Sequence, residues 1–263
     1  MAITAKDVQA LRQSTGVGMM DAKKALEANG GDMAAATQWL RVQGLASAAK
    51  RAGRPAGEGA VAAVRDGNAA AIVEMRCETD FVAKSEEFVS LVDEISARVA
   101  AEGEGAVAAF TERVETLLTT LKENISIGRV VRLVAGEGEV VETYVHQQAG
   151  RGVIAVAVVA RDASAEVAHD VAVHIAFAKP LYLTREEAPA DEVAAERATV
   201  EEISRNEGKP EAALPKIIEG RLNGWFKERV LLEQPYAKDD KQTIAQFLGA
   251  ATIVAFALVV VGS

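Results

Sequence analysis

Cys77-Glu78-Thr79-Asp80-Phe81-Val82-Ala83 is the segment in which the chain changes from a predicted strand to a predicted helix. On its N-terminal side, alternating apolar residues flank a turn at 66–68, which predicts a β-hairpin from about residue 60. On its C-terminal side, one helix is predicted from about Asp80, with an apolar stripe facing the hairpin made of Phe81, Phe88, Val92, Ile95 and Val99. On this interpretation Thr79 or Asp80 caps the helix and Phe81 is a core residue.

The elements that follow predict an α+β unit around this hairpin. Gly103 and Gly105 end the helix, and a further helix is predicted over 107–121. Strands near 130–134 complete the unit, which we bound at residues 60–139. Strands and helices thus alternate in the order expected of a sheet with helices on one face.

A second unit of the same order is predicted in residues 140–190 and 230–263. It has strands over 141–146 and 153–159 and a helix over 164–178 that ends at Pro180. The shared order predicts two related α+β subdomains with antiparallel sheets. Residues from 234 onward are expected to return to the second sheet. The apolar tail has about a dozen residues, fewer than the roughly 20 that a helix needs to span a membrane. We therefore predict that the tail is the last, buried strand of this sheet.

Residues 191–229 interrupt the second unit with two amphipathic helices. Gly208-Lys209-Pro210 marks the tip between them, and Pro215 is expected either to lie in the first turn of the second helix or to bend it. The pattern predicts an antiparallel helical hairpin of coiled-coil type, whose inward faces carry Val193, Val200 and Ile203 on one helix and Leu214, Ile218, Leu222 and Trp225 on the other.

The N-terminal residues 1–52 predict a compact domain of three short helices. Thr4 and Asp7 form a capping box, Gly16 ends the first helix, and Asp32 caps the third. Residues 53–59 continue a stretch rich in Arg, Gly and Pro, which holds no regular period and predicts a linker.

Composition favours a cytoplasmic globular protein that binds other proteins. Acidic residues outnumber basic ones by 38 to 29, for a net charge of −9. The chain has no run of about five or six basic residues, so nucleic acid is not an expected partner. The single cysteine excludes an internal disulfide, and the N-terminus shows no secretory signal.

No constellation of catalytic or metal-binding residues is visible. Cys77 has no base paired with it by sequence, and His169 and His174 are five residues apart, which puts them on different faces of a helix. Neither a GxxxxGK[ST] loop nor a GxGxxG turn is present, so direct nucleotide binding is not expected. We therefore predict no catalytic residue, no metal site and no cofactor.

Several segments along nearly the whole chain carry a family resemblance. The segment at 77–83 is very similar to the TDFV signature of the bacterial translation elongation factor Ts family, the exchange factors of elongation factor Tu. The first helical domain, from Leu11 to Leu26, resembles the family's N-terminal domain, which is of the ubiquitin-associated type. Later landmarks are Tyr144 with His146, His174 to Pro180, Gly208-Lys209-Pro210, Glu219 to Leu222 and Leu232 to Gln234.

The resemblance implies a mechanism and a set of contact residues. Asp80 and Phe81, completed by Val82 and Ala83, would wedge into the GTPase beside its nucleotide site and displace the bound magnesium, so that GDP leaves and GTP can bind. Further partner contacts implied by the resemblance come from the N-terminal domain and the central units: Met19, Met20, Lys23, Thr79, Ile125 and His146. The helical hairpin could mediate a homodimer or a 2:2 complex.

The chain also departs from the family's pattern. Lys84 and Ser85 stand where Arg and Asn are common, Gly128 stands where an Arg is frequent, and residues 258–261 replace a more charged final strand. The sequence ends at Ser263 without the extra C-terminal helical module of some members. Two other functions are weighed against exchange: an adaptor that binds an unrelated partner through residues 1–52, and an enzyme that uses Cys77.

Overall fold

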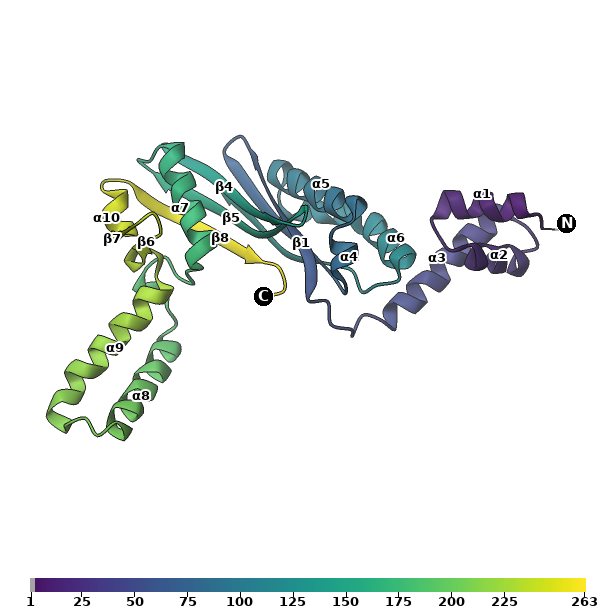
Figure 1. The fold of residues 1–263 in the computed structure, drawn as a ribbon. Coiled ribbons are helices and arrows are strands. Elements are labelled where there is room, and N and C mark those ends of the chain that lie inside the picture. The colour runs from purple at the N-terminus through teal and green to yellow at the C-terminus, as the bar shows by residue number, and fades with distance from the viewer. Residues whose placement is uncertain (1–2) are drawn as a thin grey trace.

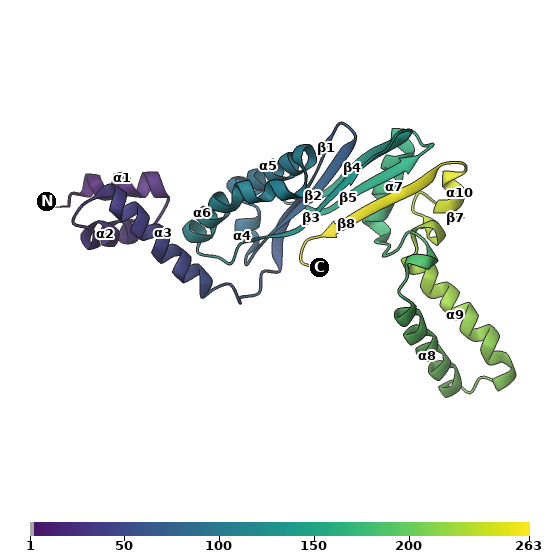
Figure 2. The ribbon, with the colours of Figure 1, turned by 180° about the vertical axis from the view of Figure 1, so that it is seen from behind.

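The computed structural model describes residues 3–263 as an elongated molecule with a layered centre (Figure 1). A three-helix module lies at the N-terminal end, two packed sheets with helices on their outer faces form the centre, and a pair of helices projects from the opposite end. The view from behind shows the last strand running beside the first sheet (Figure 2).

The first sheet is antiparallel, in the order β1-β2-β3. It consists of β1 (Glu58–Asp66), β2 (Ala69–Cys77) and β3 (Ser126–Val134). Asp66 pairs with Ala69 across a two-residue turn, in which Gly67 has a φ of 56°, a conformation that glycine adopts without strain. The predicted hairpin is confirmed, and residues 58 and 59 of the predicted linker belong to its first strand.

The second sheet is antiparallel, in the order β4-β5-β8, with β4 (Glu139–Gln148), β5 (Arg151–Arg161) and β8 (Thr252–Val260). The two sheets pack face to face over a core rich in small side chains, which include Ala70, Ala135, Ala155, Ala157 and Ala257. The approach is so close that a Cβ on Gly152 would lie 2.1 Å from the Val61 carbonyl oxygen. The α+β class with antiparallel sheets is confirmed.

Helices cover the outer face of each sheet. The helix α5 (Glu86–Glu102), the 3₁₀ helix η1 (Glu104–Phe110) and α6 (Thr111–Leu121) pack on the first sheet, and α7 (Ala165–Ala178) packs on the second. Because both faces of β2 are covered, eight of its nine residues are buried. The single helix predicted over 107–121 is wrong in its first turn, which belongs to the 3₁₀ helix.

The continuous helix predicted from Asp80 is also wrong. The chain forms α4 (Asp80–Ala83), stops at Lys84 and restarts as α5, whose N-cap Ser85 accepts a hydrogen bond from the Phe88 amide. Phe88 and the three later residues of the predicted stripe are buried, whereas Phe81 is 83% exposed. The interruption rotates Phe81 out of the stripe, so it is not a core residue.

The N-terminal module comprises α1 (Ala5–Thr15), α2 (Met19–Ala28) and α3 (Met33–Ala49). The predicted capping box at Thr4 and the Asp32 cap are both present. The module contacts the centre through α3 and α6, where a Cβ on Gly44 would lie 2.6 Å from Thr119. Arg41 adds ion pairs to Glu112 and Glu115 on α6.

The projecting pair consists of α8 (Ala190–Asn206) and α9 (Leu214–Arg229), which are flanked by short 3₁₀ helices η2 (Arg185–Glu187), η3 (Glu211–Ala213) and η4 (Leu231–Glu233). Val200 packs against three leucine and isoleucine side chains of α9. Pro215 lies in the first turn of α9, which is one of the two predicted alternatives. Ile203 is 43% exposed, so its predicted place on the inward face is wrong; Ser204 is buried there instead.

The C-terminal residues return to the second sheet by an indirect path. A separate small sheet, β6 (Pro235–Tyr236) and β7 (Asp239–Thr243), and α10 (Ile244–Leu248) precede β8. The apolar tail forms the predicted last strand, but it lies at the sheet edge and Val254 is 40% exposed, so full burial was wrong. Within residues 3–263, the helices are too short or too polar to cross a membrane.

Candidate partner-binding site

The corner between β2 and α4 presents the two residues that the sequence singles out. Phe81 is 83% exposed, the highest value among the large apolar side chains that stand out on the described surface. The Asp80 side chain next to it is 44% exposed. Burial of a Phe side chain stabilises a folded protein by about 1.5–3 kcal/mol. A Phe that faces solvent does not contribute this free energy. A solvent-facing Phe on a well-anchored turn is a candidate contact for another molecule, because an ordered side chain loses little conformational entropy on binding.

The backbone of this corner is held by a carboxylate from the segment that follows α6. Glu123 Oε2 accepts hydrogen bonds of 3.0 Å from the amides of both Glu78 and Thr79, and Glu123 Oε1 accepts one from the Thr79 hydroxyl. The same hydroxyl accepts from the Val82 amide and so caps α4, as predicted for Thr79. Hydrogen bonds to an ionised carboxylate are stronger than neutral ones.

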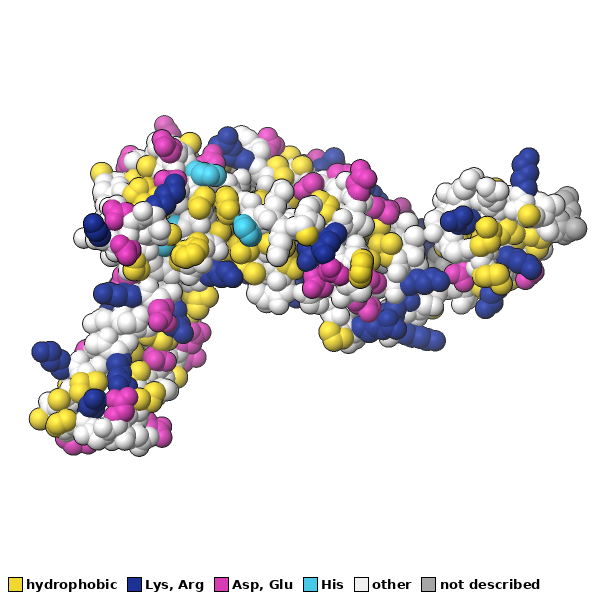
Figure 3. Space-filling model, in the orientation of Figure 1, with side chains coloured by type: hydrophobic (Ala, Val, Ile, Leu, Met, Phe, Trp, Pro, Cys, Tyr) yellow, Lys and Arg dark blue, Asp and Glu magenta, His cyan; other side chains and the backbone are white. Residues whose placement is uncertain are grey.

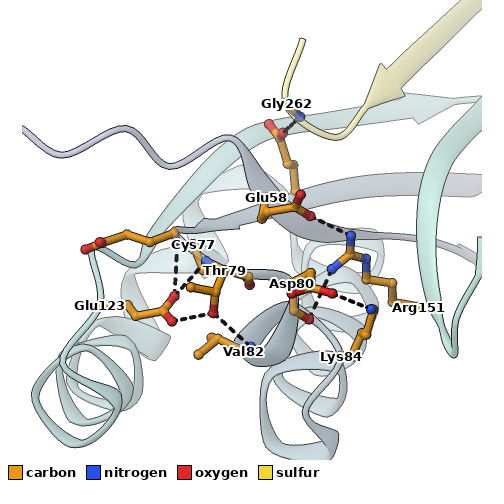
Figure 4. A network of polar contacts seen from close by, with 11 residues as sticks. Glu58, Cys77, Thr79, Asp80, Val82, Lys84, Glu123, Arg151 and Gly262 are labelled. Atoms are coloured by element: carbon orange, nitrogen blue, oxygen red, sulfur yellow. Dashed lines mark hydrogen bonds and ion pairs between the residues drawn. The ribbon is translucent and has the colours of Figure 1, made fainter.

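A second charged side chain supports the corner from the other sheet. Arg151, at the start of β5, is only 10% exposed; its Nη2 lies 2.7 Å from Glu58 Oε2, and its Nη1 donates to the Asp80 carbonyl oxygen at 3.5 Å. Figure 4 shows Glu123 and Arg151 on opposite sides of the corner. The corner is therefore held between the two halves of the centre.

The Asp80 carboxylate has an internal partner in the free protein. Lys84 Nζ lies 2.5 Å from Asp80 Oδ2, one helical turn further on. This hydrogen bond holds the pKa of Asp80 below its ordinary value, so the carboxylate is charged at neutral pH. Lys84, one of the departures from the family pattern, is therefore a basic neighbour of Asp80.

Cys77 lies directly beneath the corner, away from solvent. It is fully buried, and its Sγ donates to the Thr79 carbonyl oxygen at 3.3 Å. Burial raises the pKa of the thiol to about 12, so the thiolate is scarce at neutral pH. The geometry supports a structural role for Cys77.

Three of the predicted contact residues lie in the core of the first unit. Ala83 is fully buried, Val82 is 9% exposed and Ile125 is 2% exposed. Val82 and Ala83 anchor α4 against the hairpin, and Ile125 packs in the same cluster. In this structure Ile125 offers no surface to a partner, which differs from its predicted role in direct contact.

The remaining predicted contacts are on the surface. Met19 and Met20 in α2 are 49% and 73% exposed, and Lys23 forms an exposed ion pair with Glu27. Figure 3 shows apolar side chains gathered on this N-terminal module. His146 is exposed on β4, in the strand pair whose tip carries Arg151. The corner and the α2 surface are therefore separate patches on two parts of the molecule.

The two histidines of α7 do not converge on a ligand. His174 is buried, with Nε2 3.0 Å from Gln234 Oε1 and Nδ1 accepting from the Ala237 amide. His169 is exposed beside Glu142. Among residues 3–263, no three acidic, cysteine or histidine side chains are grouped as metal ligands. The two rings lie on different faces of the helix, as their spacing predicts.

Sequence reasoning missed Glu123 and Arg151. Both are charged residues in ordinary polar surroundings, separated from the corner by 44 and 71 residues. The one local signal is the apolar Ile125 immediately after Glu123-Asn124, which fixes this loop near the core. A hydrogen bond over such a separation depends on tertiary packing, which periodicity does not report.

Comparison with known proteins gives a consistent result along the chain. The family model described as "Elongation factor TS" matches residues 78–263. The protein named Elongation factor Ts from Clavibacter michiganensis subsp. michiganensis is 47% identical over 274 residues, covering 99% of this chain and 98% of its own length. That from Renibacterium salmoninarum is 46% identical over 264 residues, covering 95% and 94%. The protein of that name from Leifsonia xyli subsp. xyli is 46% identical over 276 residues, covering 99% of both chains.

Proposed function

This chain belongs to the elongation factor Ts family, and on that premise we propose that it is the guanine nucleotide exchange factor of its own elongation factor Tu. The family acts in translation elongation by promoting nucleotide exchange on that GTPase and is not a class of enzymes. The protein binds the GDP-bound GTPase, opens its nucleotide site and leaves when GTP has bound. It works in the cytoplasm and binds neither nucleotide, nucleic acid nor membrane itself.

The exposed Phe81 on an anchored corner carries this proposal. Asp80 and Phe81 enter the GTPase beside its nucleotide site and displace the bound magnesium. Because Glu123 and Arg151 hold the backbone on both sides, little conformational entropy is lost when Phe81 becomes buried in the partner. Val82 and Ala83 serve this step from beneath by fixing the direction of α4.

Phe81 needs help from other contacts. To shift the GTPase from nucleotide-bound to open by about 10⁴-fold requires about 5.5 kcal/mol of differential binding. Burying one Phe supplies about 1.5–3 kcal/mol. The exposed Met19 and Met20, with Lys23, dock the N-terminal module on the partner, and Thr79 and His146 contribute from the centre.

The same thermodynamics determines how the complex ends. If this protein lowers the affinity of the GTPase for GDP by a certain factor, bound GDP lowers the affinity of the GTPase for this protein by the same factor. Rebinding of nucleotide therefore releases the factor, and exchange is accelerated without a choice between GDP and GTP. A homodimer or a 2:2 complex through α8 and α9 is compatible with this cycle.

The decisive experiment is stopped-flow release of a fluorescent GDP analogue from the cognate elongation factor Tu. The GTPase is mixed with excess unlabelled GDP, alone, with this protein, and with the Phe81→Ala variant. We expect a large acceleration by the wild-type protein and a loss of about 10-fold or more in the variant. Phe177→Ala, which truncates another exposed Phe on α7 (77% exposed), is the matched control.

Each outcome of this experiment has a definite meaning. Acceleration that Phe81→Ala abolishes and Phe177→Ala retains supports exchange through the corner. Acceleration that survives in Phe81→Ala moves the critical contact elsewhere. If the wild-type protein does not accelerate release from its cognate GTPase, the exchange function is rejected and an adaptor role for the N-terminal module becomes the better explanation.

A further inference from the structure

The loop that follows α6 connects three separate parts of the molecule. Lys122, Glu123 and Asn124 are consecutive, yet their side chains contact α2, the β2–α4 corner and the segment that joins the N-terminal module to β1. Two of these parts carry the surfaces that we propose to bind the GTPase. The loop is therefore placed to control how those surfaces are oriented relative to each other.

Glu123 is bound to the corner by both of its oxygens. One oxygen accepts from two successive backbone amides, those of Glu78 and Thr79, and the other accepts from the Thr79 hydroxyl. These bonds hold the two residues that lead into α4, immediately before Asp80 and Phe81. Removal of the carboxylate would leave partly buried amides without their acceptor, which loosens the backbone locally.

Asn124 joins the corner to the connecting segment. Its side-chain amide donates to the carbonyl oxygens of Ala52 and Arg54, at 3.3 and 2.8 Å. Its backbone amide donates to Glu78 Oε1 at 2.7 Å, and the other Glu78 oxygen lies 3.5 Å from Arg54. The connecting segment and the corner therefore share one hydrogen-bond network.

Lys122 extends this network to the N-terminal module. It ends α6 in the left-handed conformation, with a φ of 60°, which costs energy for a residue other than glycine. From there its Nζ reaches Asp21 Oδ2 at 2.8 Å. Asp21 lies on α2, in the same helical turn as the exposed Met19 and Met20.

We propose that Lys122-Glu123-Asn124 is a positioning loop that orients the Asp80–Phe81 corner and links it to the N-terminal docking module. The proposal rests on the exchange function proposed above. Glu123 is the main positioning residue, because one of its oxygens accepts from two backbone amides of the corner and the other accepts from the Thr79 hydroxyl. Lys122 is an accessory residue, because both members of its ion pair are largely exposed, at 61% and 45%, and such pairs contribute little.

The first test measures the corner directly and needs no partner. Amide hydrogen exchange of Glu78 and Thr79 is followed by NMR in the full chain and in Glu123→Ala, Glu123→Gln and Glu137→Ala. We expect exchange at these two amides to be about 10-fold faster or more in Glu123→Ala. In Glu123→Gln the protection should be largely restored, because the amide oxygen can still accept from both N–H groups and the NH₂ group can donate to the Thr79 hydroxyl.

Glu137→Ala is the matched control, since it removes an exposed glutamate from the turn between β3 and β4. Its corner amides should exchange as in the wild-type protein. Thr79→Val is a second variant, which removes only the hydroxyl and keeps the size of the side chain. Unchanged protection of Glu78 and Thr79 in both Glu123→Ala and Thr79→Val would overturn the positioning role.

The second test separates positioning from a general loss of stability. The maximal rate of GDP release and the protein concentration that gives half of it are measured for each folded variant. For Glu123→Ala we expect the maximal rate to fall about 10-fold or more, with the half-saturating concentration near that of the wild-type protein, because docking through α2 persists. Glu123→Gln should recover most of the rate.

Lys122→Gln should behave differently from the Glu123 variants. It should raise the half-saturating concentration about two- to five-fold and leave the maximal rate unchanged, with the difference fading at high salt. If all variants lost exchange activity in proportion to their loss of thermal stability, the loop would have a structural role alone, and the proposal would be overturned. If the wild-type protein gives no exchange, the proposed function fails while the hydrogen-exchange test still decides whether Glu123 orders the corner.

Discussion

The two strand–strand–helix units differ in the turn from the second strand to the covering helix. In the second unit, β5 ends at Arg161, Asp162 adopts a φ of 55°, and Ser164 caps α7 directly. In the first unit, β2 ends at Cys77 and the short helix α4 intervenes before Ser85 caps α5. The extra helical turn is where Asp80 and Phe81 lie.

This difference shows that the exposed corner belongs to an extra helical turn that has no counterpart before α7 in the second unit. Each covering helix buries an apolar face, with Phe88 and Ile95 on α5 and Val171 and Ile175 on α7. The extra turn buries Val82 and Ala83 in the same core as Phe88, and polar side chains from elsewhere, Glu123 and Arg151, also hold it. Function and stability should therefore respond to different substitutions within a few residues of each other.

The largest difference in stability is expected between Phe88→Ala and Phe81→Ala in the first unit. Phe88→Ala should lower the free energy of unfolding by about 3–5 kcal/mol, because Phe88 is fully buried under the sheet. Phe81→Ala should change it by no more than about 0.5 kcal/mol, since its side chain faces solvent. Urea unfolding followed by circular dichroism measures both. Similar losses for the two variants would contradict the separation of corner and core.

The contact between the two units should be the next most sensitive feature. Gly152→Ala places a Cβ 2.1 Å from the Val61 carbonyl oxygen, so the sheets must move apart. We expect a loss of about 1–3 kcal/mol in the free energy of unfolding. Gly105→Ala, where nothing lies within 4 Å, is the control and should stay within about 0.5 kcal/mol of wild type. An unaffected Gly152→Ala would mean that the sheets are not packed this closely.

The two serine caps allow a matched comparison of the turns. Ser85 Oγ accepts from the Phe88 amide and also donates to the Val82 carbonyl oxygen of α4, whereas Ser164 Oγ accepts from the Val167 amide. Ser85→Ala and Ser164→Ala should each lower the free energy of unfolding by about 1 kcal/mol, as measured by thermal unfolding. Only Ser85→Ala should also slow GDP release from the GTPase, because only Ser85 ties α4 to α5. A loss of exchange in Ser164→Ala would break the comparison.

The smallest effect concerns pH and the second unit. Burial holds the pKa of His174 below its ordinary value, and its Nδ1 accepts from the Ala237 amide. The unfolded chain therefore binds a proton first as pH falls below about 6.5, so this contribution to stability is present above that pH and is lost below it. His174→Gln should show a smaller drop in melting temperature between about pH 7.5 and about pH 5.5 than the wild-type protein. His169→Gln, on the exposed face of the same helix, is the control.

Much of the local structure was determined by the sequence itself. The hairpin β1–β2, the three N-terminal helices and their caps, and the α+β class follow from residues near one another in the chain, whose periodicity and capping side chains act over a few positions. The family resemblance is likewise carried by short motifs, and these single out Asp80 and Phe81.

Only the tertiary structure decided which side of the corner faces solvent. Spacing alone put Phe81 and Phe88 on one stripe, but the break at Lys84 and the cap at Ser85 turned Phe81 outward. The anchors Glu123 and Arg151, and the position of β8 at a sheet edge, depend on contacts between residues far apart in sequence. Such contacts form only when the sheets and helices pack together, so a local pattern contains no record of them.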